Sequence, residues 1–473
     1  CLAVLSSGSG ARSQSVSSLR VRNLDETKLL ADTFRIDIRT ITVRLVYHPE
    51  TFRVDGEATL VFVMRPGQTR PLVHFDPETR GRSIQAVRLD GEPLDPANTV
   101  AVRIVEFPGT TQKAVEFQRD LAEGVEHILE MSYTFTQPEG YPRFSTEVND
   151  LDGHGNEEIF PTLNSPEELA RHEITLVVDS PSPYRCIGSG WVRPISAQPQ
   201  TWILDTEREV ASYTVLFALL PQADSALDER TIAGVPVRIM AFNAGARPSI
   251  PVAYDKLNDW LPKMITELGP FPMPRGLSIF LVSGGGGMEY FGGTISSLSV
   301  LRHEITHMYF GCSLIARTYR DSWWDEAATS WYEMTYQTTF AVPGAEFRTN
   351  IVGGRLPIAV GFDARAYREG AQVIEAMARQ VGNRAGLTRF FSFLYQTRAF
   401  SPFSTMDLAE IFRLYSGYDI SPSFQRWLYW GEGMSAVAPL DLSHEQTLPD
   451  LTPPRVLLEK YRIAAAAKKG GRP

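Results

Sequence analysis

The chain has 473 residues, enough for roughly two to four domains with a sizeable hydrophobic core. Hydrophobic residues make up 43% and charged residues 21%, the composition of an ordinary globular protein. The formal net charge is -9 and basic residues cluster only at Lys468-Lys469, which argues against nucleic acid as a main partner. No run of eighteen apolar residues occurs, so no membrane-spanning helix is predicted.

Cysteine is scarce, and its three positions form no CxxC pair, so neither a disulfide framework nor a cysteine zinc site is expected. The chain begins at Cys1 and continues into a Ser/Gly-rich stretch at 6–18. Three interpretations are open: the trimmed end of a signal peptide, a lipoprotein anchored at Cys1, or the stub of a longer chain. We favour an extracytoplasmic protein (secreted, periplasmic or membrane-anchored), with a cytoplasmic one as the alternative.

Residues 1–33 are low in aromatics and predict a flexible leader or a processed targeting segment. From 34 to 222 apolar and polar residues alternate, and Asp90-Gly91 is a hairpin signal. This pattern predicts an N-terminal all-β domain of sandwich or saddle type. Its strands are expected at 34–47, 58–63, 84–89, 99–106, 113–118, 126–135, 173–179, 185–192, 200–205 and 211–219.

Residues 223–435 predict a second, mainly helical domain, with short strands at 235–241 and 277–282. Its helices are expected at 251–268, 297–314, 322–338, 366–381, 384–396, 405–414 and 422–430. Residues 436–473 predict a proline-rich C-terminal segment that ends in a disordered tail.

One pentapeptide, His303-Glu-Ile-Thr-His307, carries the strongest chemical signal. Two histidines four residues apart lie on one face of a helix, so their imidazoles can converge on one metal ion. This is the HExxH zinc motif, in which Glu304 acts as general base. Catalytic zinc usually has three protein ligands, and Glu326, separated from His307 by eighteen residues, offers itself as the third. The pattern predicts one Zn²⁺ ion held by His303, His307 and Glu326.

The chain also contains an incomplete copy of the motif, which begins at His172. His172-Glu-Ile-Thr175 repeats its first four residues, but Leu176 stands where the second histidine is needed. The copy lies in an alternating run, so it predicts a strand and no metal site.

A run of four glycines, 284–287, precedes Met288-Glu289. Glycine lets the backbone approach a ligand closely, and no GK[ST] follows, so a phosphate loop is disfavoured. We expect Gly286, Gly287 and Met288 to bind an extended peptide along an exposed edge strand. The carboxylate of Glu289 would then bind its N-terminal ammonium.

Further acidic residues surround Glu326. Glu333, seven residues later on the same helix face, is predicted to orient a ligand histidine, with a solvated helix glutamate as the alternative. Asp321 and Asp325 flank Glu326, and for both a helix cap and a role behind the metal ligands stay open.

These motifs resemble the aminopeptidase N and leukotriene hydrolase family of zinc gluzincins. The zinc block, 303–311 with 321–326, has the family's spacing. Gly287-Met-Glu-Tyr290 resembles its exopeptidase motif, usually GxMEN, and Tyr367-Arg-Glu-Gly370 resembles its catalytic-tyrosine motif, usually YxKG. Three residues depart from the family: Tyr290 and Cys312 stand for asparagine, and Glu369 for lysine.

The resemblance covers roughly 34–432 and implies a multidomain α+β fold. An all-β saddle domain would precede a thermolysin-like, mainly helical zinc domain with a small mixed sheet. It also implies that Tyr367 stabilises the oxyanion and that a residue of the β domain assists Glu289. Candidates for that residue are Glu147, Asp152, Glu157 and Glu158.

The implied activity is a metallo-aminopeptidase that hydrolyses the N-terminal bond of peptides with a free N-terminus. A zinc endopeptidase on the same scaffold and a catalytically weak, zinc-holding peptide-binding protein are the alternatives.

Overall fold

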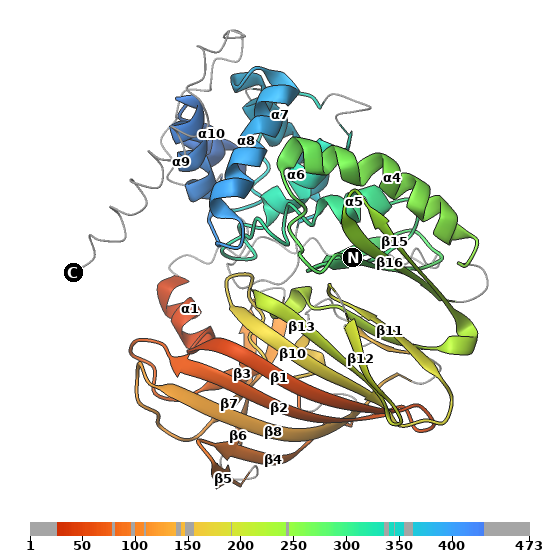
Figure 1. Ribbon diagram of the computed structural model, residues 1–473. Helices are drawn as coiled ribbons and strands as arrows, with labels where there is room; N and C mark the ends of the chain where they lie inside the picture. Colours follow the sequence, from red (N-terminus) through yellow and green to blue (C-terminus); the bar gives the residue numbers. More distant parts are fainter. Residues whose placement is uncertain are drawn as a thin grey trace, which may run out of the picture. The chain divides into compact units, whose positions relative to one another are not determined.

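The computed structural model describes most of the chain, as drawn in Figure 1. The described residues are 26–77, 81–95, 100–107, 110–138, 143–146, 156–190, 192–242, 246–334, 340–344, 346–353 and 363–429. The predicted leader before residue 26 and the predicted C-terminal tail lie outside them. Two compact units are formed by Cys1–Asn258, Met273–Ile305 and Pro357–Gly361, and by Asp259–Pro272, Thr306–Leu356 and Phe362–Pro473.

The main layer of the first unit is an eight-stranded sheet (Figure 1). In order across the sheet, its strands are β12 (Val192–Ala197), β13 (Gln200–Ala211), β10 (Leu169–Val178), β1 (Ile36–His48), β2 (Arg53–Met64), β8 (Glu126–Thr136), β4 (Ser83–Leu89) and β5 (Glu92–Leu94). All neighbours pair antiparallel except β1 with β10, which are parallel. Along β2 every second residue is buried, as the alternating sequence predicts.

Two three-stranded sheets accompany it. One comprises β11 (Tyr184–Gly188), β14 (Phe217–Pro221) and β9 (Phe144–Ser145); the other comprises β3 (Leu72–His74), β7 (Thr110–Phe117) and β6 (Val100–Phe107). Strands therefore dominate residues 34–222, as expected for the N-terminal region.

Some predicted boundaries in this region were wrong. The expected strand 185–192 is divided between β11 and β12, and a 3-10 turn, Ser212–Thr214, interrupts the expected strand 211–219. A backbone carbonyl of this turn has a hydrogen-bond partner inside the protein, because Asn156 Nδ2 donates to Ser212 O at 2.6 Å.

Helix α1 (Glu26–Thr33) occupies the end of the predicted leader. It is followed by Phe34, which is buried against the His74 ring with centroids 5.7 Å apart.

A five-stranded mixed sheet completes the first unit, in the order β15-β16-β17-β19-β18. Its strands are β15 (Ser225–Ile232), β16 (Val235–Phe242), β17 (Leu277–Leu281), β19 (Gly293–Ser296) and β18 (Gly287–Tyr290). Strand β15 lies in a segment for which no strand was predicted. Ala233 and Gly234, both with positive φ, make the hairpin turn into β16. Strand β18 is at the edge of the sheet, so the predicted edge strand that carries Glu289 is confirmed.

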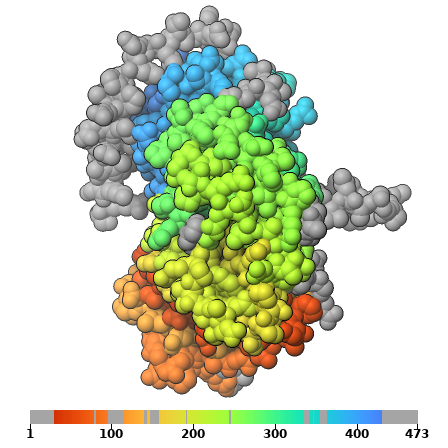
Figure 2. Space-filling model, turned by 45° about the vertical axis from the view of Figure 1, so that its right-hand side comes forward, coloured from red at the N-terminus to blue at the C-terminus, as the bar shows by residue number. Residues whose placement is uncertain are grey.

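Helix α4 (Ser249–Leu268) follows this sheet's β16 and has one buried and one exposed face. Ala253, Leu257, Trp260 and Met264 are buried at helical spacing, whereas the opposite face lies on the surface (green, Figure 2). Among the described residues, no helix is long and apolar enough to span a membrane.

The second unit is mainly helical, as predicted. Its helices are α6 (Trp323–Met334), α7 (Ala371–Gln380), α8 (Asn383–Arg398), α9 (Thr405–Ser416) and α10 (Ser421–Leu428), and a π-helical turn η4 (Ala366–Gly370) leads into α7. Buried aromatic residues join them: the ring centroid of Phe391 in α8 lies 5.9 Å from that of Trp331 in α6, and 4.9 Å from that of Phe310 in the segment before α6. The predicted domain boundary between residues 222 and 223 lies inside the first unit, which continues to Asn258 and beyond. The predicted limits of the two domains therefore stay a prediction.

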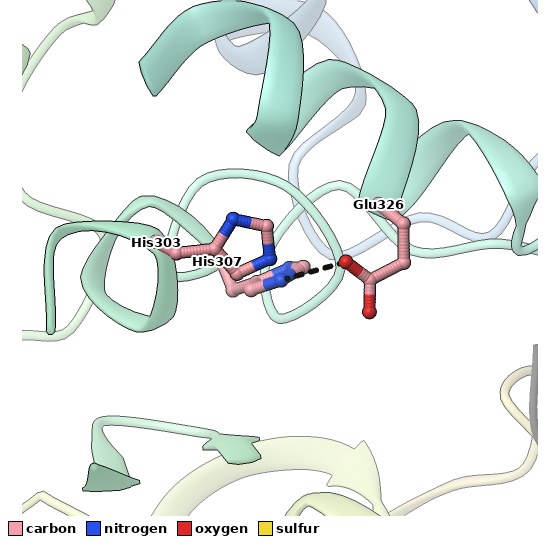
Figure 3. Close-up of side chains that lie close together, drawn as sticks. All are labelled: His303, His307 and Glu326. Carbon is pink, nitrogen blue, oxygen red and sulfur yellow. Dashed lines mark ion pairs between the residues drawn. The ribbon is translucent and has the colours of Figure 1, made fainter. Parts of the chain in front are cut away.

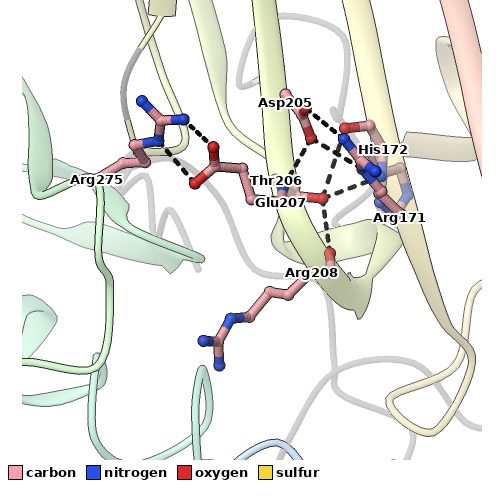
Figure 4. A network of polar contacts seen from close by, with 7 residues as sticks. All are labelled: Arg171, His172, Asp205, Thr206, Glu207, Arg208 and Arg275. Carbon is pink, nitrogen blue, oxygen red and sulfur yellow. Dashed lines mark hydrogen bonds and ion pairs between the residues drawn. The ribbon is translucent and has the colours of Figure 1, made fainter.

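The incomplete copy of the zinc motif lies in β10, as predicted. His172 is fully buried, its N–H donates to Thr206 Oγ1 at 3.0 Å, and its Nε2 lies 2.9 Å from Ser212 Oγ. Around it, Arg171 forms an ion pair with Asp205 (Figure 4). His172 therefore belongs to the framework of the β sheet.

Burial also sets how the fold responds to acid. It lowers the pKa of His172 to about 4 and that of His74 to about 3, because both imidazoles are removed from water. As pH falls below about 6.5, the unfolded chain binds protons that the folded chain cannot. We expect the free energy of unfolding to decrease between about pH 6.5 and pH 4, by on the order of 3 kcal/mol for each histidine.

Urea unfolding at a series of pH values checks this, with His172→Gln as the comparison. The variant should have a smaller loss of stability over that interval. An identical loss in the variant would contradict the role given to His172.

Candidate metal centre

The helix that carries the zinc motif, α5 (Leu301–Thr306), is much shorter than the predicted 297–314. On its N-terminal side Ser297 continues strand β19, since its N–H donates to Gly286 O at 2.9 Å. On its C-terminal side the chain turns back at Gly311, whose φ of 93° suits only glycine well. His303 lies in α5 and His307 directly follows its last residue, and the turn continues beyond it, where the N–H groups of Tyr309 and Phe310 donate to Thr306 O.

The three predicted zinc ligands come together (Figure 3). One ligand atom each from His303, His307 and Glu326 lies within 4.8 Å of the other two. His307 and Glu326 are buried and His303 is partly buried. Glu326 reaches the histidines from the first turn of α6.

The orientation of His307 favours a cation at this place. Its Nδ1 lies 2.7 Å from Asp325 Oδ1 and 3.3 Å from Phe310 O, and neither oxygen can donate a hydrogen bond. The proton is therefore on Nδ1, and Nε2 faces Glu326 Oε2 at 3.4 Å. A cation between them would satisfy both the nitrogen lone pair and the carboxylate oxygen. Zn²⁺ takes imidazole and carboxylate ligands together, so these residues fit zinc.

Tyr367 lies beside the same ligand. Its hydroxyl donates to Glu326 Oε1 at 2.9 Å, on the other oxygen of the carboxylate that faces His307. The π-helical turn η4 brings Tyr367 there, and Gly370 lets it approach α6 closely: a Cβ on Gly370 would lie 2.8 Å from Ala327 Cβ. Such π turns often occur at functional sites. Sequence reasoning missed Gly370 and Ala327, because neither carries a polar group.

Glu304 and Glu289 form a second acidic group next to His307. One ligand atom from each of these three residues lies within 4.8 Å of the other two. Glu304 is buried, and its carboxylate packs on the backbone of β18, where a Cβ on Gly287 would lie 2.5 Å from Glu304 Cδ. The glycine run thus brings the edge strand onto the predicted general base.

The other predicted substrate-binding residues lie next to these two. Gly286 N–H is 3.4 Å from Ser297 Oγ, and Gly286 O accepts from Ser297 N–H. The side chain of Met288 packs against the apolar cluster around Phe280. Only its backbone is therefore suited to contact a substrate.

The acidic residues around Glu326 have different partners. Asp321 accepts from Thr318 Oγ1 and from the N–H and hydroxyl of Thr405, and so joins α6 to the start of α9. Its predicted role behind the metal ligands stays a prediction. The residue in contact with a ligand is Asp325. Glu333 is partly exposed in α6, and its role stays a prediction.

Which residue of the β domain assists Glu289 stays a prediction. Glu147 and Asp152 lie outside the described residues, and so does the side chain of Glu157. Glu158 is buried next to Arg82, with Oε2 3.7 Å from Arg82 Nη2, and so has a structural partner.

No protein-family model and no curated protein sequence matches this chain. Several solved structures do. A mutant of an M1 zinc metallopeptidase from Deinococcus radiodurans, bound to a Tyr-Ser-Ala substrate, matches with TM-score 0.59 and 18% identity over 89% of this chain and 96% of that one. Native yeast LTA4 hydrolase matches with TM-score 0.63 and 12% identity, over 86% and 69%. Aminopeptidase A of Legionella pneumophila, in complex with aspartic acid, matches with TM-score 0.66 and 12% identity, over 84% and 50%.

At sequence identities this low, the matches show a shared fold and nothing about the activity. The chain matches almost the whole Deinococcus enzyme and half of the Legionella enzyme. The resemblance drawn from the motifs is thereby confirmed at the level of architecture: the chain has the multidomain α+β fold of the M1 zinc metallopeptidases.

Proposed function

We propose that the chain is a zinc-dependent aminopeptidase, which hydrolyses the first peptide bond of peptides with a free N-terminus. The observation that carries the proposal is the position of Glu289, whose carboxylate lies within 4.8 Å of ligand atoms of both Glu304 and His307. A carboxylate at this distance from the general base matches the dimensions of an N-terminal residue.

The dimensions follow from covalent geometry. The α-amino nitrogen is two bonds from the scissile carbonyl carbon, about 2.5 Å away. A charge-assisted hydrogen bond adds about 2.8 Å, so the carboxylate that binds the ammonium must be about 5 Å from the reacting carbon. Glu289 meets this condition if the carbonyl is next to Glu304. In a longer substrate bound through its middle, the same carboxylate would face an uncharged peptide group.

Strand β18 supports the same orientation. It is the edge of its sheet, and its outer N–H and C=O groups can pair with the substrate backbone. Because Glu289 is near the end of this strand, a peptide paired with β18 would place its first residue at the carboxylate.

Each residue then has one task. His303, His307 and Glu326 would hold one Zn²⁺, which when bound polarises the scissile carbonyl and makes its water more acidic. Glu304 accepts the proton of the attacking water and transfers it to the departing amine. The Tyr367 hydroxyl, which donates to Glu326 here, would donate to the oxyanion of the tetrahedral intermediate.

The ligands bound in two of the matching structures, a Tyr-Ser-Ala tripeptide and aspartic acid, are of the chemical class expected for this site.

The first prediction concerns the substrate amine. A peptide with a free N-terminus should be cleaved at its first bond, and its N-acetylated form should react with a kcat/KM at least about 30-fold lower, since it cannot pair with Glu289. Mass spectrometry of the products measures both rates and the bond cleaved. Equal cleavage of the acetylated peptide, or cleavage at internal bonds, would instead support an endopeptidase.

The second prediction concerns the general base. Glu304→Gln keeps the size of the side chain but cannot accept the water proton, so kcat should fall by about 10²-fold or more. Zinc content, measured by atomic emission on the purified variant, should equal that of the wild type. An active Glu304→Gln enzyme would exclude Glu304 as the base.

The third prediction concerns the contact between β18 and Glu304. Gly287→Ala places a methyl group against the Glu304 carboxylate, so kcat should fall by about tenfold or more while zinc stays bound. Gly285→Ala is the matched control, because a Cβ there meets no atom within 4 Å. Similar kcat values for the two variants would show that this contact does not position Glu304.

A further inference from the structure

The imidazole ring of His307 is held in place by neighbouring polar groups. Three oxygens surround its Nδ1: Asp325 Oδ1 at 2.7 Å, Thr329 Oγ1 at 3.2 Å and Phe310 O at 3.3 Å. Of these three contacts, the one with Asp325 is the shortest and is to a carboxylate. It is therefore the principal acceptor for the Nδ1 proton, which leaves the Nε2 lone pair for a metal.

Asp325 and Glu326 are consecutive residues in the first turn of α6, and they contact opposite nitrogens of one imidazole. Consecutive helical residues diverge by about 100°, so both can reach one ring only if the ring lies between their side chains. The rotation of the His307 ring is thereby fixed from both sides. Its side chain is 1% exposed, and that of Asp325 is 14% exposed.

A glycine makes room for Asp325. A Cβ on Gly311 would lie 2.3 Å from Asp325 Oδ2 and 2.5 Å from Asp325 Oδ1, closer than any real contact. Gly311 also has a φ of 93°, and it ends the turn that follows His307. The chain after the zinc motif therefore returns against the carboxylate that orients the motif's second histidine.

We propose that Asp325 is a positioning residue for the metal centre: by holding the Nδ1 proton of His307, it sets the affinity with which the site retains Zn²⁺. This inference rests on the proposed zinc function, and Gly311 contributes through the space that it leaves for Asp325. Asp325 would act through His307, since it is not one of the three residues that would hold the ion.

The test measures zinc affinity by competition with a chromogenic chelator on the full-length protein. Asp325→Ala should weaken the Kd for Zn²⁺ by about 10- to 100-fold. Asp325→Asn keeps an acceptor oxygen without the charge and should lie between wild type and Asp325→Ala. The control is Glu375→Gln, another buried carboxylate of the same unit, bonded to Trp331 of α6 at 2.8 Å. It should keep the wild-type Kd even if its melting temperature falls.

A double-mutant cycle separates positioning from a general loss of structure. Gly311→Ala should weaken zinc binding in the wild-type chain by displacing Asp325. In the Asp325→Ala chain the same change should have a smaller effect on the Kd, because the carboxylate that it displaces is gone and only the strain of the Gly311 backbone remains.

The outcomes distinguish the two proposals. A wild-type chain that does not bind zinc would overturn the proposed function, and this inference with it. A wild-type chain that binds zinc, with Asp325→Ala within about twofold of its Kd, would overturn the positioning role alone. Equal effects of Gly311→Ala in both backgrounds would exclude the route through Asp325.

Discussion

The arrangement on which the candidate site depends is the imidazole of His307, enclosed between Asp325 on one nitrogen and Glu326 on the other. It joins the end of α5 to the start of α6, which are separated by a long irregular loop. A carboxylate lies against each imidazole nitrogen, and this fixes the orientation of the ring. Tyr367 then contacts the remaining oxygen of Glu326, so the candidate groups of the second unit are linked through one carboxylate.

Three glycines allow the functional groups of the candidate site to lie this close together. Gly287 lies against Glu304, Gly311 against Asp325 and Gly370 against Ala327, and in each case a methyl group would overlap its neighbour. Only Gly311 also needs glycine for its backbone conformation. The other two are needed for proximity, since a backbone without a side chain can approach a buried carboxylate or a neighbouring helix. The chain thus positions its reactive groups with residues that have no chemistry of their own.

The residues that bear chemistry could largely be predicted from the sequence, because their spacing reflects one turn of helix or one alternation of a strand. His303 and His307 converge for that reason, and Glu289 lies on an edge strand as expected. The extent of α5 could not be predicted, since it depends on Ser297 pairing with Gly286. Nor could Asp325 be distinguished from Asp321: both flank Glu326, and only the packing of α6 shows which one meets the histidine.

Strand β18 has a consequence for the solubility of the protein. An unpaired sheet edge is a place where other chains can add as strands, and a long apolar edge promotes aggregation. Here the edge strand has four residues and pairs antiparallel with β19, so alternate residues direct their N–H and C=O groups away from β19. A short edge strand is one of the ways in which native proteins disfavour edge-to-edge pairing, and β18 has this property at the edge where the proposed substrate would bind.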